Sequence, residues 1–213
     1  MPLLPEPLPA SPVLVVSEWL NDALREQARP NPNAMSLATV NGDGQPSVRV
    51  VLCKELVTEP GYLVFYTNYQ SAKSADIQTN PKVSFLMHWD RQGRQVRGEG
   101  LLVKSPASES DAYFMSRDRG SRIGAWASAQ SQTVQSRATL EAQFAATAER
   151  FQNQDVPRPE HWGGYRLWFT AIELWLSMDS RLHDRALWKR TVKTNPDGTP
   201  EAGNWQTVGR LQP

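Results

Sequence analysis

Cysteine, histidine and long hydrophobic runs are scarce in this sequence. Its 213 residues include one cysteine, Cys53, and three histidines, His88, His161 and His183. A single cysteine excludes an internal disulfide and a structural metal site of several thiolates, and it fits a reducing compartment. Three scattered histidines argue against a histidine-rich metal centre. No apolar stretch approaches the ~20 residues of a membrane span, and no basic segment followed by an apolar core opens the chain. We therefore expect a cytoplasmic protein with no metal and no membrane association.

An excess of charge of one sign is also lacking. The chain has 23 Lys and Arg against 22 Asp and Glu, a formal net charge of +1, so no global field favours nucleic acid. It has no glycine-rich phosphate loop, no histidine pair at zinc spacing and no Gly-x-Ser-x-Gly turn. Several candidate anion sites remain, without a protein nucleophile and its base. Such a protein is suited to bind a phosphorylated cofactor that performs the chemistry.

Hydrophobic periodicity predicts a mainly β protein with flanking α-helices. Residues 1–12 are rich in proline and predict an extended arm, followed by one domain over residues 13–213. Predicted strands cover 35–40, 47–54, 62–67, 83–89, 95–103, 165–177, 186–192 and 205–210. Predicted helices run from a cap at Ser11 toward Pro30, over 71–78, from a cap at Ser105 to about 116, from about 121, and over 140–151. Helices and strands do not alternate strictly, which favours a mainly antiparallel barrel with helices outside it over a doubly wound sheet.

The densest polar motif is Arg181-Leu182-His183-Asp184-Arg185, which follows an apolar run over residues 167–175. It combines two guanidiniums, an imidazole and a carboxylate where a buried strand leaves the sheet. Arginine matches phosphate and carboxylate geometry, and histidine titrates near neutral pH. The motif therefore predicts either an anion site or a solvated turn with local salt bridges, and the pentapeptide alone does not decide between them.

Three further segments carry anion-binding residue types. Arg49 and Lys54 stand at the two ends of an apolar strand, so their side chains can share a pocket only if a bulge or a strand end lies between them. Residues 66–73 place hydroxyls, amides and Lys73 where a strand meets a helix, which fits a phosphate site or an ordinary capped helix. Tyr113, Arg117 and Ser121 recur at intervals of four and could converge on one point, or form an ordinary polar helix end.

Taken in order, these segments resemble the pyridoxine (pyridoxamine) 5'-phosphate oxidase family from about residue 13 to the C-terminus. The matching motifs are Arg49 to Lys54, Phe65 to Asn68, Arg94 to Val96, Ser121 to Trp126, Gln130-Ser131, Trp162 to Arg166, Arg181 to Arg185 and Arg210 to Pro213. The resemblance implies a split β-barrel that binds FMN over residues 13–213 and forms a homodimer with FMN between the subunits. It also implies oxidation of pyridoxamine 5'-phosphate and pyridoxine 5'-phosphate to pyridoxal 5'-phosphate, in which O2 accepts the electrons and H2O2 forms.

The family pattern assigns roles residue by residue. Arg181 and His183 are the implied catalytic residues. The phosphorylated substrate is assigned to Lys54, Tyr113, Arg117, Ser121, Arg181, Leu182 and His183. FMN is assigned to Arg49, Val50, Val51, Leu52, Cys53, Lys54, Tyr66, Thr67, Lys73, Gln95, Gln130, Ser131, Trp175 and Arg185.

Two positions depart from the family pattern. Ala72 stands where the family usually has an arginine before the lysine, which removes one phosphate donor unless Arg91, Arg94 or Arg97 replaces it. The proline-rich arm also lacks the arginines and the tyrosine that family members often place over the substrate. Two alternatives therefore stay open: a flavin-dependent oxidase of the phenazine-biosynthesis type, and a flavin- or vitamer-binding protein without turnover.

Overall fold

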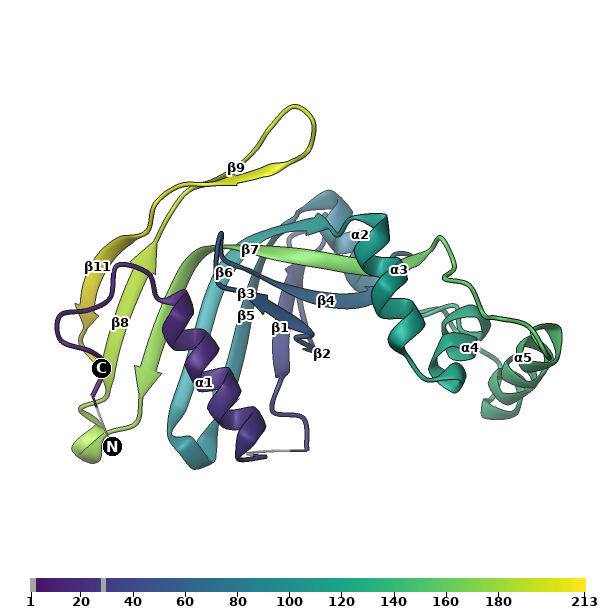
Figure 1. Ribbon diagram of the computed structural model, residues 1–213, viewed down its shortest axis with the longest axis horizontal. Coiled ribbons are helices and arrows are strands. Elements are labelled where there is room, and N and C mark those ends of the chain that lie inside the picture. The colour runs from purple at the N-terminus through teal and green to yellow at the C-terminus, as the bar shows by residue number, and fades with distance from the viewer. Residues whose placement is uncertain (1–2, 28–29) are drawn as a thin grey trace.

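The longest strand, β7 (Trp162–Leu176), organises the fold. In the computed structural model, which describes residues 3–27 and 30–213, β6 (Arg94–Lys104) pairs along β7 on one side. The other side is shared: β4 (Tyr62–Asn68) pairs with residues 162–168, and β8 (Asp184–Lys189) pairs with residues 171–176. Because two strands divide one edge of β7, the antiparallel sheet splits and curls into a half-barrel (Figure 1).

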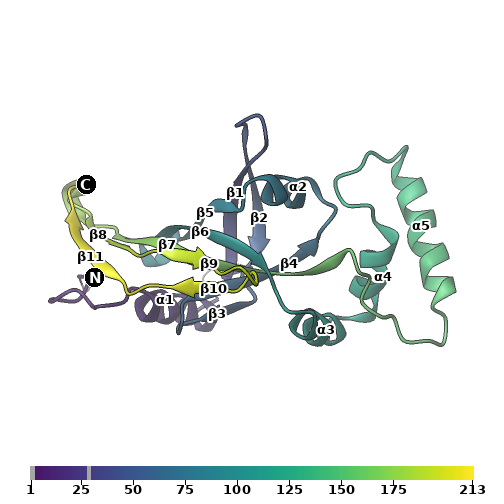
Figure 2. The ribbon, with the colours of Figure 1, turned by 90° about the horizontal axis from the view of Figure 1, so that it is seen from above.

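The remaining elements extend this sheet or cover it (Figures 1 and 2). The main sheet follows the order β11-β8-β7-β6-β5-β1-β2, with β3 attached to β4, and β9 and β10 form a separate hairpin. The other strands are β1 (Ala34–Val40), β2 (Pro46–Leu52), β3 (Glu55–Val57), β5 (Lys82–Trp89), β9 (Val192–Thr194), β10 (Pro200–Ala202) and β11 (Gln206–Leu211). The helices are α1 (Val13–Arg25), α2 (Ala72–Thr79), α3 (Ala107–Ser116), α4 (Arg119–Ala127) and α5 (Arg137–Arg150), with short 3-10 turns η1 (Asp90–Gln92) and η2 (Asp179–Arg181).

The predicted mainly β fold with flanking helices is confirmed, and most element boundaries lie within a few residues of the prediction. The cap assignments at Ser11 and Ser105 are wrong: α1 begins after Pro12 and α3 after Pro106, and neither helix has a side-chain cap. Helix α1 ends at Arg25, well before Pro30, and Ala28 and Arg29 lie outside the described residues. The short strands β3, β9 and β10 were not predicted, because three residues are too few to show a hydrophobic period.

The N-terminal arm forms neither helix nor strand over residues 3–12, yet it packs on the sheet. Leu4 is 3% exposed and belongs to the main hydrophobic core. The Leu4 amide donates to Asp184 Oδ2 over 2.8 Å, and Trp188 Nε1 donates to the carbonyl of Pro9 over 2.8 Å. The arm therefore fastens the first described residues to β8. Met1 and Pro2 of the predicted arm lie outside the described residues.

Helices α4 and α5 lie beyond the end of β7 that is remote from both termini (Figure 2). Helix α5 forms as predicted, but Phe144 is 41% exposed, since the helix packs on α4 and not on the sheet. The second, smaller apolar cluster joins Phe151 to Ile123 and Val156. Over residues 3–27 and 30–213, no helix is long and apolar enough to cross a membrane.

Candidate active site

A cavity of ≈ 740 Å³ lies where β2, β4, α2, α3 and α4 meet. This volume is typical of small-molecule sites. Many of the residues predicted for cofactor or substrate line it: Val50, Val51, Leu52, Lys54, Tyr66, Thr67, Lys73, Tyr113, Arg117, Ser121 and Gln130. Residues from five separate segments of the chain thus converge on one site, although their roles stay predictions.

Arg49 and Lys54 do not belong to one continuous strand. Strand β2 ends at Leu52, and the Lys54 amide donates to the carbonyl of Val64 on β4 over 2.8 Å. The chain therefore changes direction between the two cations. Lys54 lines the cavity, while the guanidinium of Arg49 turns toward β1 and α2.

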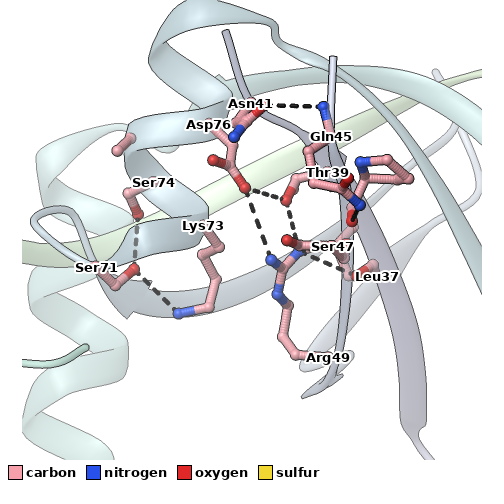
Figure 3. Close-up of polar contacts among 12 residues, drawn as sticks. Leu37, Thr39, Asn41, Gln45, Ser47, Arg49, Ser71, Lys73, Ser74 and Asp76 are labelled. Atoms are coloured by element: carbon pink, nitrogen blue, oxygen red, sulfur yellow. Dashed lines mark hydrogen bonds and ion pairs between the residues drawn. The ribbon is translucent and has the colours of Figure 1, made fainter. Parts of the chain in front are cut away.

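Lys73 is a buried cation that lines the cavity. Its Nζ donates to Thr67 Oγ1 over 2.9 Å and to Gln130 Oε1 over 3.2 Å. It also donates to Ser71 Oγ over 3.0 Å, the contact drawn in Figure 3. Burial, and secondarily the nearby charge of Arg49, lower the pKa of Lys73 from 10.5 to about 8. No carboxylate among the residues that the structure describes pairs with this ammonium. A buried ammonium surrounded only by neutral oxygens is suited to receive an anion from outside the chain.

Arg49 lies beside Lys73 and is tied in place by β1 and α2 (Figure 3). Its Nη1 donates to Thr39 Oγ1 over 2.7 Å and to the carbonyl of Leu37 over 3.2 Å. Asp76 Oδ2 accepts from Thr39 Oγ1 over 2.6 Å and lies 3.7 Å from Arg49 Nη2. The network fixes a second positive charge close to the first. Asp76, the residue of this network on α2, lies one helical turn after Ala72, and Ala72 is exposed.

Tyr113, Arg117 and Ser121 reach the cavity from two helices. Helix α3 ends at Ser116 and α4 begins at Arg119, so the spacing of four does not correspond to one continuous helix. Asp118 caps α4 by accepting from the Ser121 amide over 2.8 Å. Arg117 Nη1 is buried and has no hydrogen-bond partner among the described residues, and burial lowers the pKa of this guanidinium. The three side chains nevertheless line one cavity, as the sequence suggested.

Several residues that line the cavity were not predicted from the sequence as cofactor or substrate residues. These are Asn68, Asp118, Gly124, Ala125, Ser128 and Trp162. Trp162 is the largest of them, and its ring lies parallel to those of Tyr66 and Tyr113. The signal was present, since Trp162 opens the motif Trp162 to Arg166, but nothing in the sequence indicated that this ring faces the cavity.

A second set of predicted residues lies at the other end of β7. Gln95, Trp175 and Arg185 are direct neighbours across β6, β7 and β8. The His183 ring lies 4.5 Å from that of Trp175, and Arg181 is exposed with a φ of 62° in the turn after β7. Leu182 is also exposed, and none of these residues lines the cavity. Figure 1 shows this turn, η2, far from α3 and α4, so one chain does not bring the two sets together.

Glu173 anchors this second set. Its carboxylate is 3% exposed and accepts from Arg185 Nε over 2.9 Å and from Arg97 Nε over 2.8 Å. Arg97 is therefore occupied, and Arg94 pairs with Asp22 over 2.8 Å. Neither arginine lines the cavity, nor does the exposed Arg91, so within one chain none of them replaces the donor missing at position 72.

Three more predicted cofactor residues, Arg49, Cys53 and Ser131, do not line the cavity. Cys53 is buried and donates its thiol to the carbonyl of Glu55 over 3.3 Å, and burial raises the pKa of that thiol to about 12. Its side chain therefore serves packing. Ser131 is exposed with a φ of 71°, directly after the cavity residue Gln130.

Comparisons with known proteins agree with this arrangement. Residues 20–151 match the family described as pyridoxamine 5'-phosphate oxidase, and residues 162–213 match the pyridoxine 5'-phosphate oxidase C-terminal dimerisation region. A curated pyridoxine/pyridoxamine 5'-phosphate oxidase of Burkholderia lata is 48% identical over 202 residues, which cover 95% of this chain and 89% of that protein.

Two solved structures extend the likeness to the fold. PhzG from Burkholderia lata, in complex with tetrahydrophenazine-1-carboxylic acid, superposes with a TM-score of 0.84 at 28% identity, covering 96% of this chain and 94% of that chain. A pyridoxamine 5'-phosphate oxidase-related, FMN-binding protein from Nostoc punctiforme shares the fold with a TM-score of 0.65 at 16% identity, covering 93% of this chain and 95% of that chain.

Proposed function

Because this chain belongs to the pyridoxamine 5'-phosphate oxidase family, we propose that it oxidises pyridoxamine 5'-phosphate and pyridoxine 5'-phosphate to pyridoxal 5'-phosphate, with O2 as acceptor and H2O2 as a product. When the amine is the substrate, water is consumed and ammonia is released. The observation that carries the proposal is the pair of cations, Lys73 and Arg117, that face one cavity. Neither forms an ion pair with a carboxylate among the described residues, and Asp118, the acidic residue of the cavity lining, caps α4. Two anion sites in one cavity fit a phosphorylated cofactor beside a phosphorylated substrate.

FMN is the proposed cofactor, and the residues around Lys73 fit its phosphate. Lys73, Thr67 and Gln130 form one polar group at the floor of the cavity, with the charge of Arg49 next to it. When bound, a flavin supplies a ring that accepts hydride from the substrate and passes electrons to O2. Strand β2 provides the exposed backbone and apolar side chains of Val50 and Val51 along the cavity wall.

The phosphate of the vitamer would bind at the opposite wall of the cavity. Lys54 and Arg117 supply charge, while Tyr113 and Ser121 supply hydroxyl donors. Together they would hold the pyridine ring against the cofactor, and positioning of this kind is the main catalytic task left to the protein. Arg181 and His183 would cover the substrate from the other side.

A homodimer would complete the site, because Arg181 and His183 lie far from the cavity of their own chain (Figure 1). They belong to residues 162–213, which match the C-terminal dimerisation region of the family. The exposed apolar residues of β2, Val48 at 68% and Val50 at 66%, would also become covered by a partner subunit. We propose that each cavity receives Arg181 and His183 from the partner subunit.

The likeness to PhzG supports a second candidate, an oxidase of reduced phenazines. The cavity favours the vitamer, because four donors at Lys54, Tyr113, Arg117 and Ser121 suit a phosphate better than a single carboxylate on a tricyclic ring. A flavin- or vitamer-binding protein without turnover is a third candidate, and the assay described next tests it.

The decisive assay mixes the FMN-saturated protein in air with pyridoxamine 5'-phosphate or pyridoxine 5'-phosphate and follows pyridoxal 5'-phosphate and H2O2 together. We expect both products in equal amounts, and their rates rank the two substrates. If flavin binds but neither vitamer reacts, the vitamer assignment is wrong, and tetrahydrophenazine-1-carboxylic acid becomes the substrate to try. If that compound is also inert, a binding role is favoured.

A further inference from the structure

We propose that Trp162 is a positioning residue that sets specificity, because it holds the Arg117 guanidinium in the orientation that recognises a substrate phosphate. This inference rests on the proposed function, since it assigns a role at the same site. Trp162 lines the cavity and would act on the substrate through Arg117.

The contact between the two side chains is a stacked cation–π pair. The guanidinium carbon of Arg117 lies 4.7 Å from the centre of the Trp162 ring. Trp162 is 7% exposed, so its ring is shielded from water. A cation–π contact is stronger when it is shielded in this way. A flat guanidinium on an indole face keeps its donors in its own plane, and the buried Arg117 Nη1 has no partner among the described residues. The ring thus fixes a cation while leaving its donors free for a ligand.

Trp162 also belongs to a stack of three nearly parallel rings. Its plane is inclined by 8° to that of Tyr66 and by 4° to that of Tyr113, at centroid distances of 5.5 and 6.2 Å. Tyr66 and Tyr113 stack at 3.9 Å. Tyr113 lies closest to Tyr66, so Tyr66 supports this candidate phosphate donor while Trp162 supports Arg117.

The main chain that carries the indole is anchored by its neighbours. The Trp162 carbonyl accepts from Arg158 Nη1 over 2.7 Å, and residue 162 pairs with Asn68 at the end of β4. The next residue must be glycine, because a Cβ on Gly163 would lie 2.3 Å from the Tyr69 hydroxyl oxygen. Neighbouring segments therefore approach too closely for the start of β7 to shift, and a rigid support of this kind is what a positioning residue requires.

The test compares Trp162→Leu with Trp162→Phe in the FMN-saturated enzyme. With leucine, we expect the KM for pyridoxamine 5'-phosphate to rise about tenfold with a smaller change in kcat, and with phenylalanine we expect a smaller rise in KM, because a ring remains under the guanidinium. The preference for pyridoxamine 5'-phosphate over unphosphorylated pyridoxamine should fall by a similar factor. FMN affinity, measured by quenching of flavin fluorescence, should stay within about twofold of the parent.

A double-mutant cycle separates positioning from general damage to the fold. In an Arg117→Ala background, Trp162→Leu should add less than about a twofold change in KM, because the cation that it positions is gone. Trp126→Leu is the matched control, since Trp126 stacks on Arg150 at 5.0 Å outside the cavity and should leave KM unchanged.

Independent effects of Trp162→Leu and Arg117→Ala, or an unchanged KM in Trp162→Leu, would overturn the inference. If the leucine variant does not fold, Trp162→Phe takes its place in the cycle. The KM of Trp162→Phe is then compared with that of the parent, and the KM of the double variant Arg117→Ala/Trp162→Phe with that of Arg117→Ala. Failure of the parent enzyme to oxidise either vitamer would instead overturn the proposed function, so the two failures are distinguishable.

Discussion

Lys73 and Arg117 face the same cavity, but neutral groups hold them in different ways. Lys73 is surrounded by side-chain oxygens, which accept its hydrogen bonds without cancelling its charge. Arg117 lies over two aromatic rings, at 4.7 Å from the centre of Trp162 and 5.6 Å from that of Phe114. By contrast, the half-buried Arg94 and Arg185 have carboxylate partners. The cavity therefore keeps positive charge available, and this is the property that an anion site needs.

The first prediction concerns the pH dependence of cofactor binding at Lys73. Its pKa of about 8 means that the free protein loses this proton as the pH rises through 8. A bound phosphate dianion favours the protonated lysine, so binding takes up a proton above that pH. FMN affinity should therefore be flat from about pH 7 to 8 and weaken by up to about tenfold per pH unit above it. Titration of FMN by fluorescence quenching from pH 7 to 9.5 measures this.

Two controls isolate the lysine. Riboflavin carries no phosphate, so its weaker binding should show little of this pH dependence. Lys73→Arg keeps its charge throughout the range and should flatten the FMN profile. An FMN affinity that stays constant to pH 9.5 in the parent protein would mean that Lys73 does not contact the phosphate.

Several elements could be predicted from the sequence because their signals are local. Helix α1 follows from Val16, Trp19, Leu20, Ala23 and Leu24 at helical spacing. The first four are buried as the pattern requires, whereas Leu24 is 45% exposed. Strand β1 shows the strict alternation of a half-buried strand. The apolar face of α5 was misleading, since periodicity does not say what covers a face, and Phe144 remains exposed in the single chain.

The candidate site was predictable as a set of residues but not as an arrangement. The Lys54 site depends on β2 ending at Leu52, and no residue type marks that end. The shared edge of β7, which puts Trp175 and Arg185 far from Lys73, is a property of long-range pairing. Trp162 was missed for the same reason, because only tertiary contacts show which face of a buried ring meets the cavity.

At the scale of elements, the N-terminal arm is expected to stabilise the β8–β11 end of the sheet. Leu4 is 3% exposed, whereas its neighbour Leu3 is 61% exposed. Replacing Leu4 with alanine removes buried apolar surface and should lower the free energy of unfolding by about 2 kcal/mol. Leu3→Ala, the matched control, should change it by less than about 0.5 kcal/mol. Urea unfolding followed by tryptophan fluorescence measures both, and equal effects of the two variants would show that the arm does not pack as described.

The arm also contacts residues beside the turn that carries Arg181 and His183. Asp184 accepts from the Leu4 amide and pairs with Arg210, and Arg210 Nη2 donates to Glu6 Oε2 over 2.9 Å. Asp184 follows His183 directly, so both ends of the chain are fastened to the turn that carries the candidate catalytic residues. Instead of a lid over the cavity of its own chain, this arm forms a support for the second set of site residues.

At the scale of the whole molecule, the proposed composite site would make the dimer a condition for activity. Within one chain, η2 and the cavity lie toward opposite ends of β7 (Figures 1 and 2). A two-fold dimer repeats every contact, so a turn that reaches the partner's cavity does so twice and completes two sites. Concentrations that dissociate the dimer should then abolish turnover even if FMN stays bound to single chains.

The final prediction tests this composite site by complementation. Arg117→Ala and Arg181→Ala should each reduce the homodimer to a small but measurable fraction of the parent's activity, since every site then lacks one residue. In a heterodimer of the two variants, one site combines both intact residues and the other combines both defects. Random pairing makes half of all dimers heterodimers, so co-expression should restore about a quarter of the parent's specific activity. Co-expression of Arg117→Ala with Lys54→Ala is the matched control, because both residues line the cavity of one chain and no intact site can form. If the first pair recovers no more activity than the control, Arg181 does not act across the subunit interface, and each cavity works without its partner.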